Sequence, residues 1–139
     1  MQDARKLRPH LKFLTGDFFH GFRKAQDHPG TDPSCKLCSA PEETTEHILT
    51  ICPSLSEVRQ RLFPGLMNRV ASVQPSCRIL QSSTSAILTQ FILDCTSINL
   101  EESFRIPAHN HNNQEIFSLS RDWCHAASSA RTRLLKKKP

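Results

Sequence analysis

Three cysteines and one histidine follow each other at metal-ligand spacing, as Cys-x2-Cys-x8-His-x4-Cys. They are Cys35, Cys38, His47 and Cys52. Thiolate sulfur and imidazole nitrogen are the donors that tetrahedral Zn²⁺ takes in proteins, and a Cys-x-x-Cys turn aims two thiolates at one point. We predict one Zn²⁺ bound by these four side chains. Because four protein ligands leave no coordination position open, the site is expected to be structural and not hydrolytic.

A short helix must carry the second pair of ligands. The run from Thr44 through His47 predicts a helix that a threonine caps. On an unbroken α-helix, Cys52 would point about 140° away from His47, because successive residues turn by about 100°. Pro53 disfavours helical backbone at Cys52, so we expect the helix to stop by Ile51 and the last ligand to swing back. We also expect Lys36 to favour the thiolate forms of its neighbours.

Other readings of the cysteines remain open. Cys35 and Cys38 are alternatively free thiols or a redox pair, although a thioredoxin-like motif needs a βαβ context that this sequence lacks. Six cysteines without a secretory signal favour metal binding or buried thiols over disulfides. Cys77 and Cys95 are interpreted as packed thiols. A second metal site of looser spacing is an alternative use of four residues: His109, His111, Cys124 and His125.

The remaining sequence predicts a mainly α fold, in which a small zinc-stapled knuckle is followed by packed helices with little or no strand. Apolar residues at helical spacing predict four further helices. They run from Asp3 to about Thr15, from Leu55 to an end at Pro64-Gly65, from Ala86 to Ile98, and from about Gln114 into the basic tail. Trp123 lies on the apolar stripe of the last helix and is expected in the core.

Length and composition suit one ordinary domain, or one small domain with an attached helical piece. The chain has 139 residues, of which 37% are hydrophobic, enough for a modest core. We predict four parts: 1–31, an N-terminal helix with an aromatic anchor segment; 32–63, the zinc-binding module with its following helix; 64–135, a helical C-terminal region; and 136–139, a basic tail. No paired catalytic aspartates or dispersed carboxylates argue for polymerase or nuclease activity, so we expect no enzyme.

The net charge of +5 belongs to the C-terminal end of the chain. Residues 131–139 hold five basic residues and no acidic one, which leaves residues 1–130 with 13 of each sign. The loop between Cys38 and His47 is acidic and is expected to repel phosphate. Candidate nucleic-acid contacts are therefore the two ends: Arg5, Lys6, Arg8 and Lys12, with Arg23 and Lys24, and Arg131, Arg133, Lys136, Lys137 and Lys138. The other reading is a solvated helix face and a solubilising or nuclear-localisation-like tail.

No apolar run approaches the roughly 20 residues that a membrane span requires, and the first residues lead into no signal-peptide core. We expect no membrane partner and an intracellular location, in the nucleus or the cytoplasm.

Four segments together resemble the C-terminal zinc-binding region of non-LTR retrotransposon reverse transcriptases. They are Leu11–Gly16 with its Leu-Thr-Gly, Asp32–Cys38 with the Cys-x-x-Cys, Glu43–Leu49 with a Glu-His before apolar residues, and Cys52-Pro53. The match covers roughly residues 5–63. The family often has Gly-His where this chain has Gly16-Asp17.

The resemblance implies that Cys35, Cys38, His47 and Cys52 are the zinc ligands. It also implies a detached, truncated or domesticated C-terminal piece that helps a polymerase to engage RNA or DNA. The alternative function is a protein-interaction module, in which zinc fixes a helical surface. The stripe of Leu7, Leu11 and Leu14, or that of Trp123, would then dock onto a partner such as the polymerase part of a retroelement protein.

Overall fold

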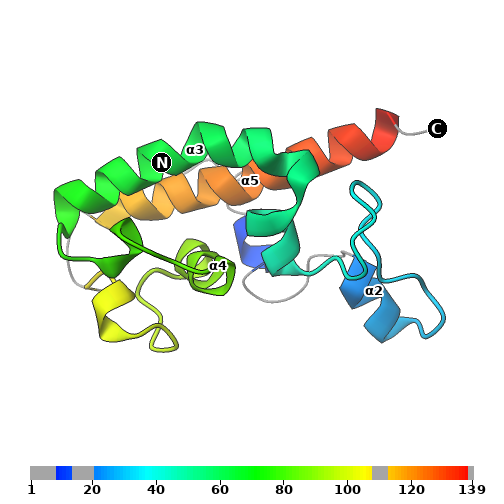
Figure 1. The fold of residues 1–139 in the computed structure, drawn as a ribbon, viewed down its shortest axis with the longest axis horizontal. Coiled ribbons are helices and arrows are strands. Elements are labelled where there is room, and N and C mark those ends of the chain that lie inside the picture. The colour runs from blue at the N-terminus through cyan, green and yellow to red at the C-terminus, as the bar shows by residue number, and fades with distance from the viewer. Residues whose placement is uncertain (1–8, 14–20, 108–112, 138–139) are drawn as a thin grey trace.

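The computed structural model describes residues 9–13, 21–107 and 113–137, and Figure 1 shows their arrangement. They form helices, helical turns and loops without any strand, which confirms the predicted mainly α fold. After a helical turn at 9–13, the elements are α2 (Gly21–Asp27), η1 (His47–Ile51), η2 (Pro53–Leu55), α3 (Ser56–Val73), η3 (Arg78–Leu80), α4 (Ser85–Leu93), η4 (Glu102–Phe104) and α5 (Asn113–Lys137). None of the described helices is long and apolar enough to cross a membrane.

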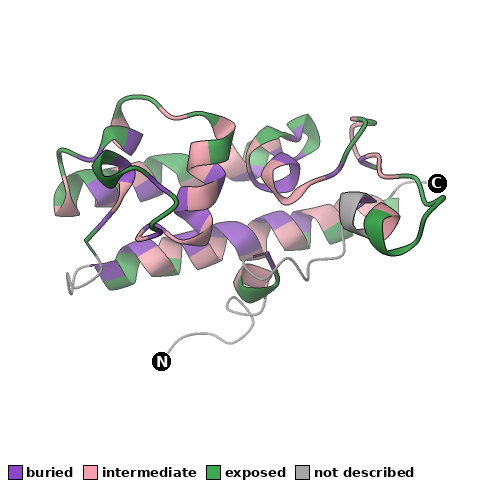
Figure 2. Cartoon of the chain, turned by 90° about the horizontal axis from the view of Figure 1, so that it is seen from below, coloured by how far each residue is buried: buried purple, intermediate pink, exposed green. Residues whose placement is uncertain are grey.

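The two long helices α3 and α5 lie side by side and run in opposite directions (Figure 1). Two contacts fix their register. The rings of Phe63 and Trp123 meet edge to face with centroids 6.4 Å apart, and Arg69 Nε lies 2.9 Å from a carboxylate oxygen of Glu115. Buried residues recur at helical spacing along α5, and Figure 2 shows them as purple segments that alternate with half-buried pink ones. This helix pair is the frame against which the remaining elements pack.

Trp123 joins the helix pair to the segment that carries the predicted ligands. Its side chain is buried, as predicted, and its indole N–H donates to the carbonyl oxygen of Leu49 in η1 at 3.0 Å. Leu49 is itself fully buried, and the apolar residues Phe91 and Ile92 of α4 belong to the same core. Helix η1, which carries His47, therefore packs against the core.

The predicted end of a helix at Pro64-Gly65 is wrong. Pro64 lies inside α3, which continues to Val73, so the predicted division between residues 63 and 64 falls within this helix. An interior proline costs about 3 kcal/mol because it removes one backbone hydrogen bond and crowds the preceding turn. Leu66 and Val70 beyond it are fully buried, and burial of such side chains stabilises by about 1.5–3 kcal/mol each. Packing therefore outweighs the local preference.

The helix predicted from Ala86 to Ile98 is shorter, because it ends at Leu93. The carboxylate of Asp94 accepts hydrogen bonds from the amide and the hydroxyl of Thr96, at 3.0 and 2.7 Å. This side chain competes with the next helical turn and closes the helix as an Asx turn. Cys95 is nevertheless buried, whereas Ile98 is 87% exposed.

The two terminal helices are described to different extents. The last helix is confirmed as α5 and continues through Lys137, where its basic residues suit the negative end of the helix dipole. Of the helix predicted from Asp3 to about Thr15, residues 9–13 are helical, with Phe13 buried and Leu11 46% exposed. The rest of that helix lies outside the described residues, as do Phe18 and Phe19 of the predicted aromatic anchor segment, and nothing is described of the Phe22 side chain.

Replacing Pro64 with alanine is expected to raise the free energy of unfolding by about 1–3 kcal/mol, because the exposed alanine restores the missing hydrogen bond. Urea denaturation followed by circular dichroism measures the change. Gly65→Ala is the control: its added methyl group meets open space, so it should stabilise by only about 0.5–1 kcal/mol. A Pro64→Ala protein no more stable than the parent chain would show that α3 depends on the proline.

Candidate metal centre

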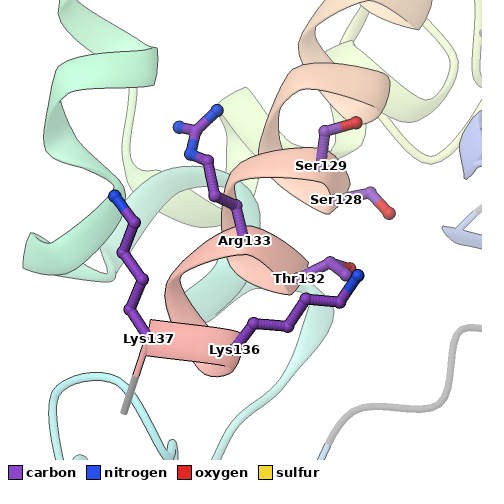
Figure 3. A pocket seen from close by; sticks show the side chains of 6 residues that line it. All are labelled: Ser128, Ser129, Thr132, Arg133, Lys136 and Lys137. Carbon is purple, nitrogen blue, oxygen red and sulfur yellow. The ribbon is translucent and has the colours of Figure 1, made fainter.

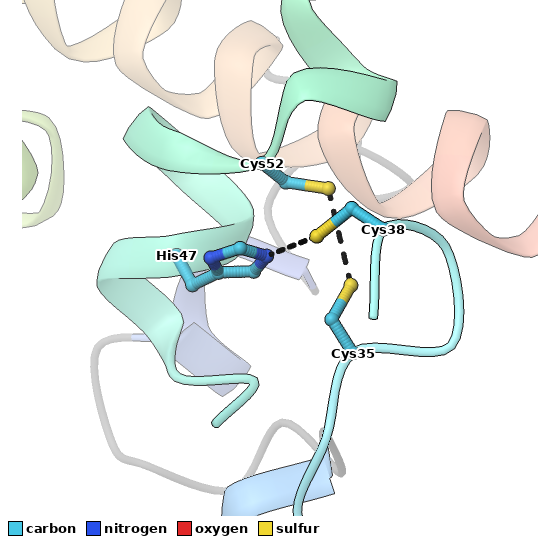
Figure 4. A group of neighbouring side chains, drawn as sticks. All are labelled: Cys35, Cys38, His47 and Cys52. Carbon is cyan, nitrogen blue, oxygen red and sulfur yellow. Dashed lines mark hydrogen bonds between the residues drawn. The ribbon is translucent and has the colours of Figure 1, made fainter. Parts of the chain in front are cut away.

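The four predicted ligands converge on one point, as Figure 4 shows. Their donor atoms all lie within 4.8 Å of one another. The sulfur atoms of Cys35 and Cys52 are 3.9 Å apart, and the sulfur of Cys38 lies 3.2 Å from Nε2 of His47. The cluster is largely shielded from solvent, since Cys35, His47 and Cys52 are buried and Cys38 is half-buried.

These distances suit one tetrahedral ion. With metal–sulfur bonds of about 2.3 Å, two sulfur ligands of a tetrahedral ion lie about 3.8 Å apart, and a sulfur and an imidazole nitrogen about 3.6 Å apart. The Cys35–Cys52 sulfur separation of 3.9 Å is close to the first value, and the Cys38–His47 separation of 3.2 Å is somewhat shorter than the second. The four side chains are therefore positioned to hold one metal ion, with three sulfur donors and one nitrogen donor.

A tight turn presents the first two thiols. The amide of Cys35 donates to the carbonyl oxygen of Ala40, and the amide of Ser39 donates to that of Cys35, both at 2.9 Å. Ser39 has a φ of 66°, in the left-handed region that few residues other than glycine adopt. The backbone amides of Leu37 and Cys38 also donate toward the Cys35 sulfur. The turn therefore directs N–H groups at the sulfur that a metal would bind.

The second pair of ligands is brought together by a widened helical turn. Helix η1 (His47–Ile51) is a π-helix, in which the amide of Cys52 donates to the carbonyl oxygen of His47 at 2.7 Å. This i to i+5 bond places Cys52 above His47, whereas an α-helix would turn it away. The predicted stop at Ile51 is confirmed. The expectation that Pro53 alone redirects Cys52 is incomplete, because the π-turn does much of this within the helix.

Burial sets the protonation of the ligands before any metal binds. It raises the pKa of Cys35 to about 12, against the hydrogen bonds that the amides of Cys38 and Leu37 donate. It likewise raises the pKa of Cys52 and lowers that of His47. Metal binding must therefore displace thiol protons, and the ion's own charge supplies the driving force. We expected Lys36 to favour the thiolate forms of its neighbours. Its ammonium instead forms an exposed ion pair with Asp32 at 3.1 Å.

Arg59 brings a positive charge to the ligand cluster. One guanidinium nitrogen donates to the carbonyl oxygen of Ile51 at 3.3 Å, while Nη1 is buried without a hydrogen-bond partner among the described residues. Burial lowers the pKa of Arg59, and the Cys52 sulfur acts in the opposite direction, which places the guanidinium near this ligand. The sequence offered no signal for this neighbour beyond its position on the following helix.

Glu43 connects the ligand loop to α5. Its carboxylate is 1% exposed and receives two hydrogen bonds from the Arg131 guanidinium, at 2.8 and 3.0 Å, and one from the Gly21 amide at 2.7 Å. Burial acts to raise the pKa of Glu43, but these donors outweigh it, so the pKa lies below its usual value. The acidic loop is thus not wholly presented to solvent, and Arg131 is committed to an internal ion pair. No local sequence signal joins residues 88 apart.

Gly21 permits this arrangement through close backbone approach. A Cβ atom there would lie 2.7 Å from the carbonyl oxygen of Pro33 and 2.8 Å from that of Ser34. Both are backbone atoms, so no side chain can move aside. Glycine at this position allows α2 to lie against the segment that leads into Cys35.

The other predicted site residues are placed as follows. Lys12 is exposed on the 9–13 turn, and Lys24 is half-buried on α2. Three basic residues of the tail, Arg133, Lys136 and Lys137, are exposed on the last turns of α5 and line a hollow with Ser128, Ser129 and Thr132 (Figure 3). The candidates outside the described residues are Arg5, Lys6, Arg8 and Lys138, and nothing is described of the Arg23 side chain.

The alternative second metal site gains no support where the chain is described. There, the cluster of Cys35, Cys38, His47 and Cys52 is the single group of three or more potential ligands. Cys124 is buried and His125 is half-buried on α5, while His109 and His111 fall outside the described ranges. Cys77 and Cys95 are buried thiols, as predicted.

Comparison with protein-family models, with curated proteins and with solved structures gives no match.

Replacing Arg131 with methionine is expected to lower the free energy of unfolding by about 3–5 kcal/mol, because it leaves the buried Glu43 carboxylate without its cation. The matched control is Arg133→Met, two residues along the same helix on an exposed side chain, which should change stability by less than about 0.5 kcal/mol. Urea denaturation of both variants measures the difference. Equal effects would contradict a specific role for the Glu43–Arg131 pair.

Proposed function

We propose that the chain is a non-catalytic module whose fold is stabilised by one structural Zn²⁺. The observation that carries this proposal is the convergence of three sulfur donors and one imidazole nitrogen within 4.8 Å. Sulfur-rich tetrahedral sets select zinc among the common divalent metals, and four protein ligands leave no position for a reacting water. Zinc bound there supplies folding free energy; the protein residues orient the donors and exclude solvent.

We further propose that the module is related to the C-terminal zinc-binding region of retroelement reverse transcriptases. Support comes from the sequence motif, whose four ligand positions are the same residues that meet in the structure. A reduced intracellular setting, in the nucleus or the cytoplasm, suits a site made of thiolates.

Within this function, we propose that exposed basic residues bind RNA or DNA, and that the acidic loop between Cys38 and His47 does not. The supporting observation is that Arg133, Lys136 and Lys137 are exposed at the end of α5 beside three hydroxyl side chains. Arg131 leaves the set of candidate contacts because Glu43 occupies its guanidinium. Phosphate neutralised by such residues releases counterions, so binding of this kind depends strongly on salt.

The alternative is a protein-interaction module. It is favoured by four large apolar side chains that are exposed in the described part of the chain: Leu11 at 46%, Ile51 at 45%, Phe63 at 40% and Ile98 at 87%. Trp123, which we expected to be able to dock onto a partner, is 1% exposed and packs inside the protein, so its stripe is not available. Of the other proposed stripe, Leu7 and Leu14 lie outside the described residues.

Cobalt substitution tests the metal assignment. We expect one Co²⁺ per chain with the intense absorption of thiolate coordination, and its displacement by Zn²⁺. Cys38→Ser should weaken metal binding at least tenfold and lose protection from proteolysis around residues 33–53, since it removes one of four ligands. The control is Cys77→Ser, whose hydroxyl can still donate to the Phe104 carbonyl oxygen as the thiol does. Equal metal affinities for the two variants would contradict the ligand assignment.

Salt titration separates the two functions. Binding of a fluorescent oligonucleotide should weaken steeply between about 50 and 200 mM salt, and further in a Lys136→Gln/Lys137→Gln variant. In-place substitution is preferable to removing residues 131–139, because that truncation also removes Arg131 from Glu43. Absence of binding at 50 mM salt, or binding insensitive to salt, would favour the protein-interaction module.

A further inference from the structure

A groove lies between the start of α3 and the end of α5. It has a volume of about 300 Å³, and its walls include Arg61 and Glu57 of α3 and His125, Ser129 and Arg133 of α5. Ser54, which precedes α3, also lines the groove, and its hydroxyl donates to the carbonyl oxygen of Leu37 between the first two ligands. The groove therefore begins beside the candidate metal centre.

The groove continues into the basic hollow at the end of α5. The two share Ser129 and Arg133, and the hollow, of about 510 Å³, adds Lys136 and Lys137 (Figure 3). Positions 129, 133, 136 and 137 recur at helical spacing, so they share one face of α5. At 1.5 Å per residue they extend over about 12 Å, a length that spans three to four phosphates of one strand at about 3.4 Å per phosphate along a duplex axis.

The charges along this path are open to a ligand. Arg61, Arg133, Lys136 and Lys137 form no ion pair with any described residue, whereas Glu57 is the single carboxylate among the lining residues. In contrast, Arg131, two residues before Arg133 on α5, is neutralised by Glu43. The His125 ring also lines the groove, with its Nδ1 buried and without a hydrogen-bond partner in the described part of the chain. The path thus combines four basic side chains that have no ion-pair partner within the described ranges with several hydroxyl groups.

We propose that this groove and the adjoining hollow bind the sugar–phosphate backbone of nucleic acid, with Arg61 and Arg133 as the central phosphate contacts. The proposal rests on the nucleic-acid function proposed above and adds its location. Arg61 and His125 join the tail residues as parts of one surface. Because no Phe, Tyr or Trp lines the path and His125 supplies its single aromatic ring, the contacts are mainly to phosphate, and the binding is largely independent of sequence.

Fluorescence anisotropy of the zinc-loaded chain with 20-nucleotide single-stranded RNA, single-stranded DNA and duplex DNA at 50–200 mM salt tests the location. Arg61→Gln should weaken binding roughly three- to tenfold and reduce the slope against log salt by about 0.7–0.9, the share of one phosphate contact. Glu57→Gln should strengthen binding, which loss of structure does not do. Arg78→Gln is the charge-matched control, beyond the other end of α3, and should bind as the parent chain does.

Three results would each contradict one or both proposals. If the Lys136→Gln/Lys137→Gln variant loses binding while Arg61→Gln and Glu57→Gln match the parent chain, the groove is wrong and nucleic-acid binding by the tail stands. If the parent chain binds none of the three probes at 50 mM salt, both proposals fall. Equal competition by an acidic 20-residue peptide would assign the surface to protein partners instead.

Discussion

Four side chains from two separate segments must reach one point, and much of the local structure serves that requirement. The Cys35–Cys38 turn places Ser39 at a φ of 66°, and the π-turn brings Cys52 over His47. A left-handed non-glycine residue costs about 1–2 kcal/mol, and a π-turn is rare in isolation. Zinc binding to such sets provides about 10–16 kcal/mol, which exceeds these costs severalfold. A bound metal ion would therefore offset the cost of this backbone conformation.

Charge balance extends the same constraint to the helices. Three thiolates around a divalent ion carry a net charge of −1, and the Glu43 carboxylate nearby adds another. The guanidinium groups of Arg59 and Arg131 supply two positive charges, so this region would be neutral overall with the ion bound. Since unpaired buried charge is strongly destabilising, the two arginines are part of the site although neither is a ligand. The Glu43–Arg131 ion pair also connects the loop between Cys38 and His47 to α5, which carries the proposed phosphate contacts.

The convergence of the four candidate ligands and the mainly α class were predictable because each depends on local spacing. Cys-x-x-Cys, the Glu-His pair and Cys52-Pro53 lie within one short segment. The apolar residues of α5 recur at helical spacing in the sequence itself. The errors arose where tertiary contacts or side-chain hydrogen bonds decide. Pro64 is tolerated because Leu66 and Val70 pack beyond it, and Asp94 ends α4 through Thr96. The pairing of Glu43 with Arg131 could not be predicted from the sequence. The two residues are 88 positions apart, and in the sequence each looks like an ordinary surface charge.

X-ray absorption spectroscopy at the zinc edge, on protein purified without chelator and quantified by elemental analysis, tests the central claim most directly. We predict one zinc per chain, with three sulfur ligands at about 2.3 Å and one nitrogen ligand at about 2.0–2.1 Å. A zinc content near zero, together with free reaction of Cys35 and Cys38 with a thiol reagent, would contradict the account.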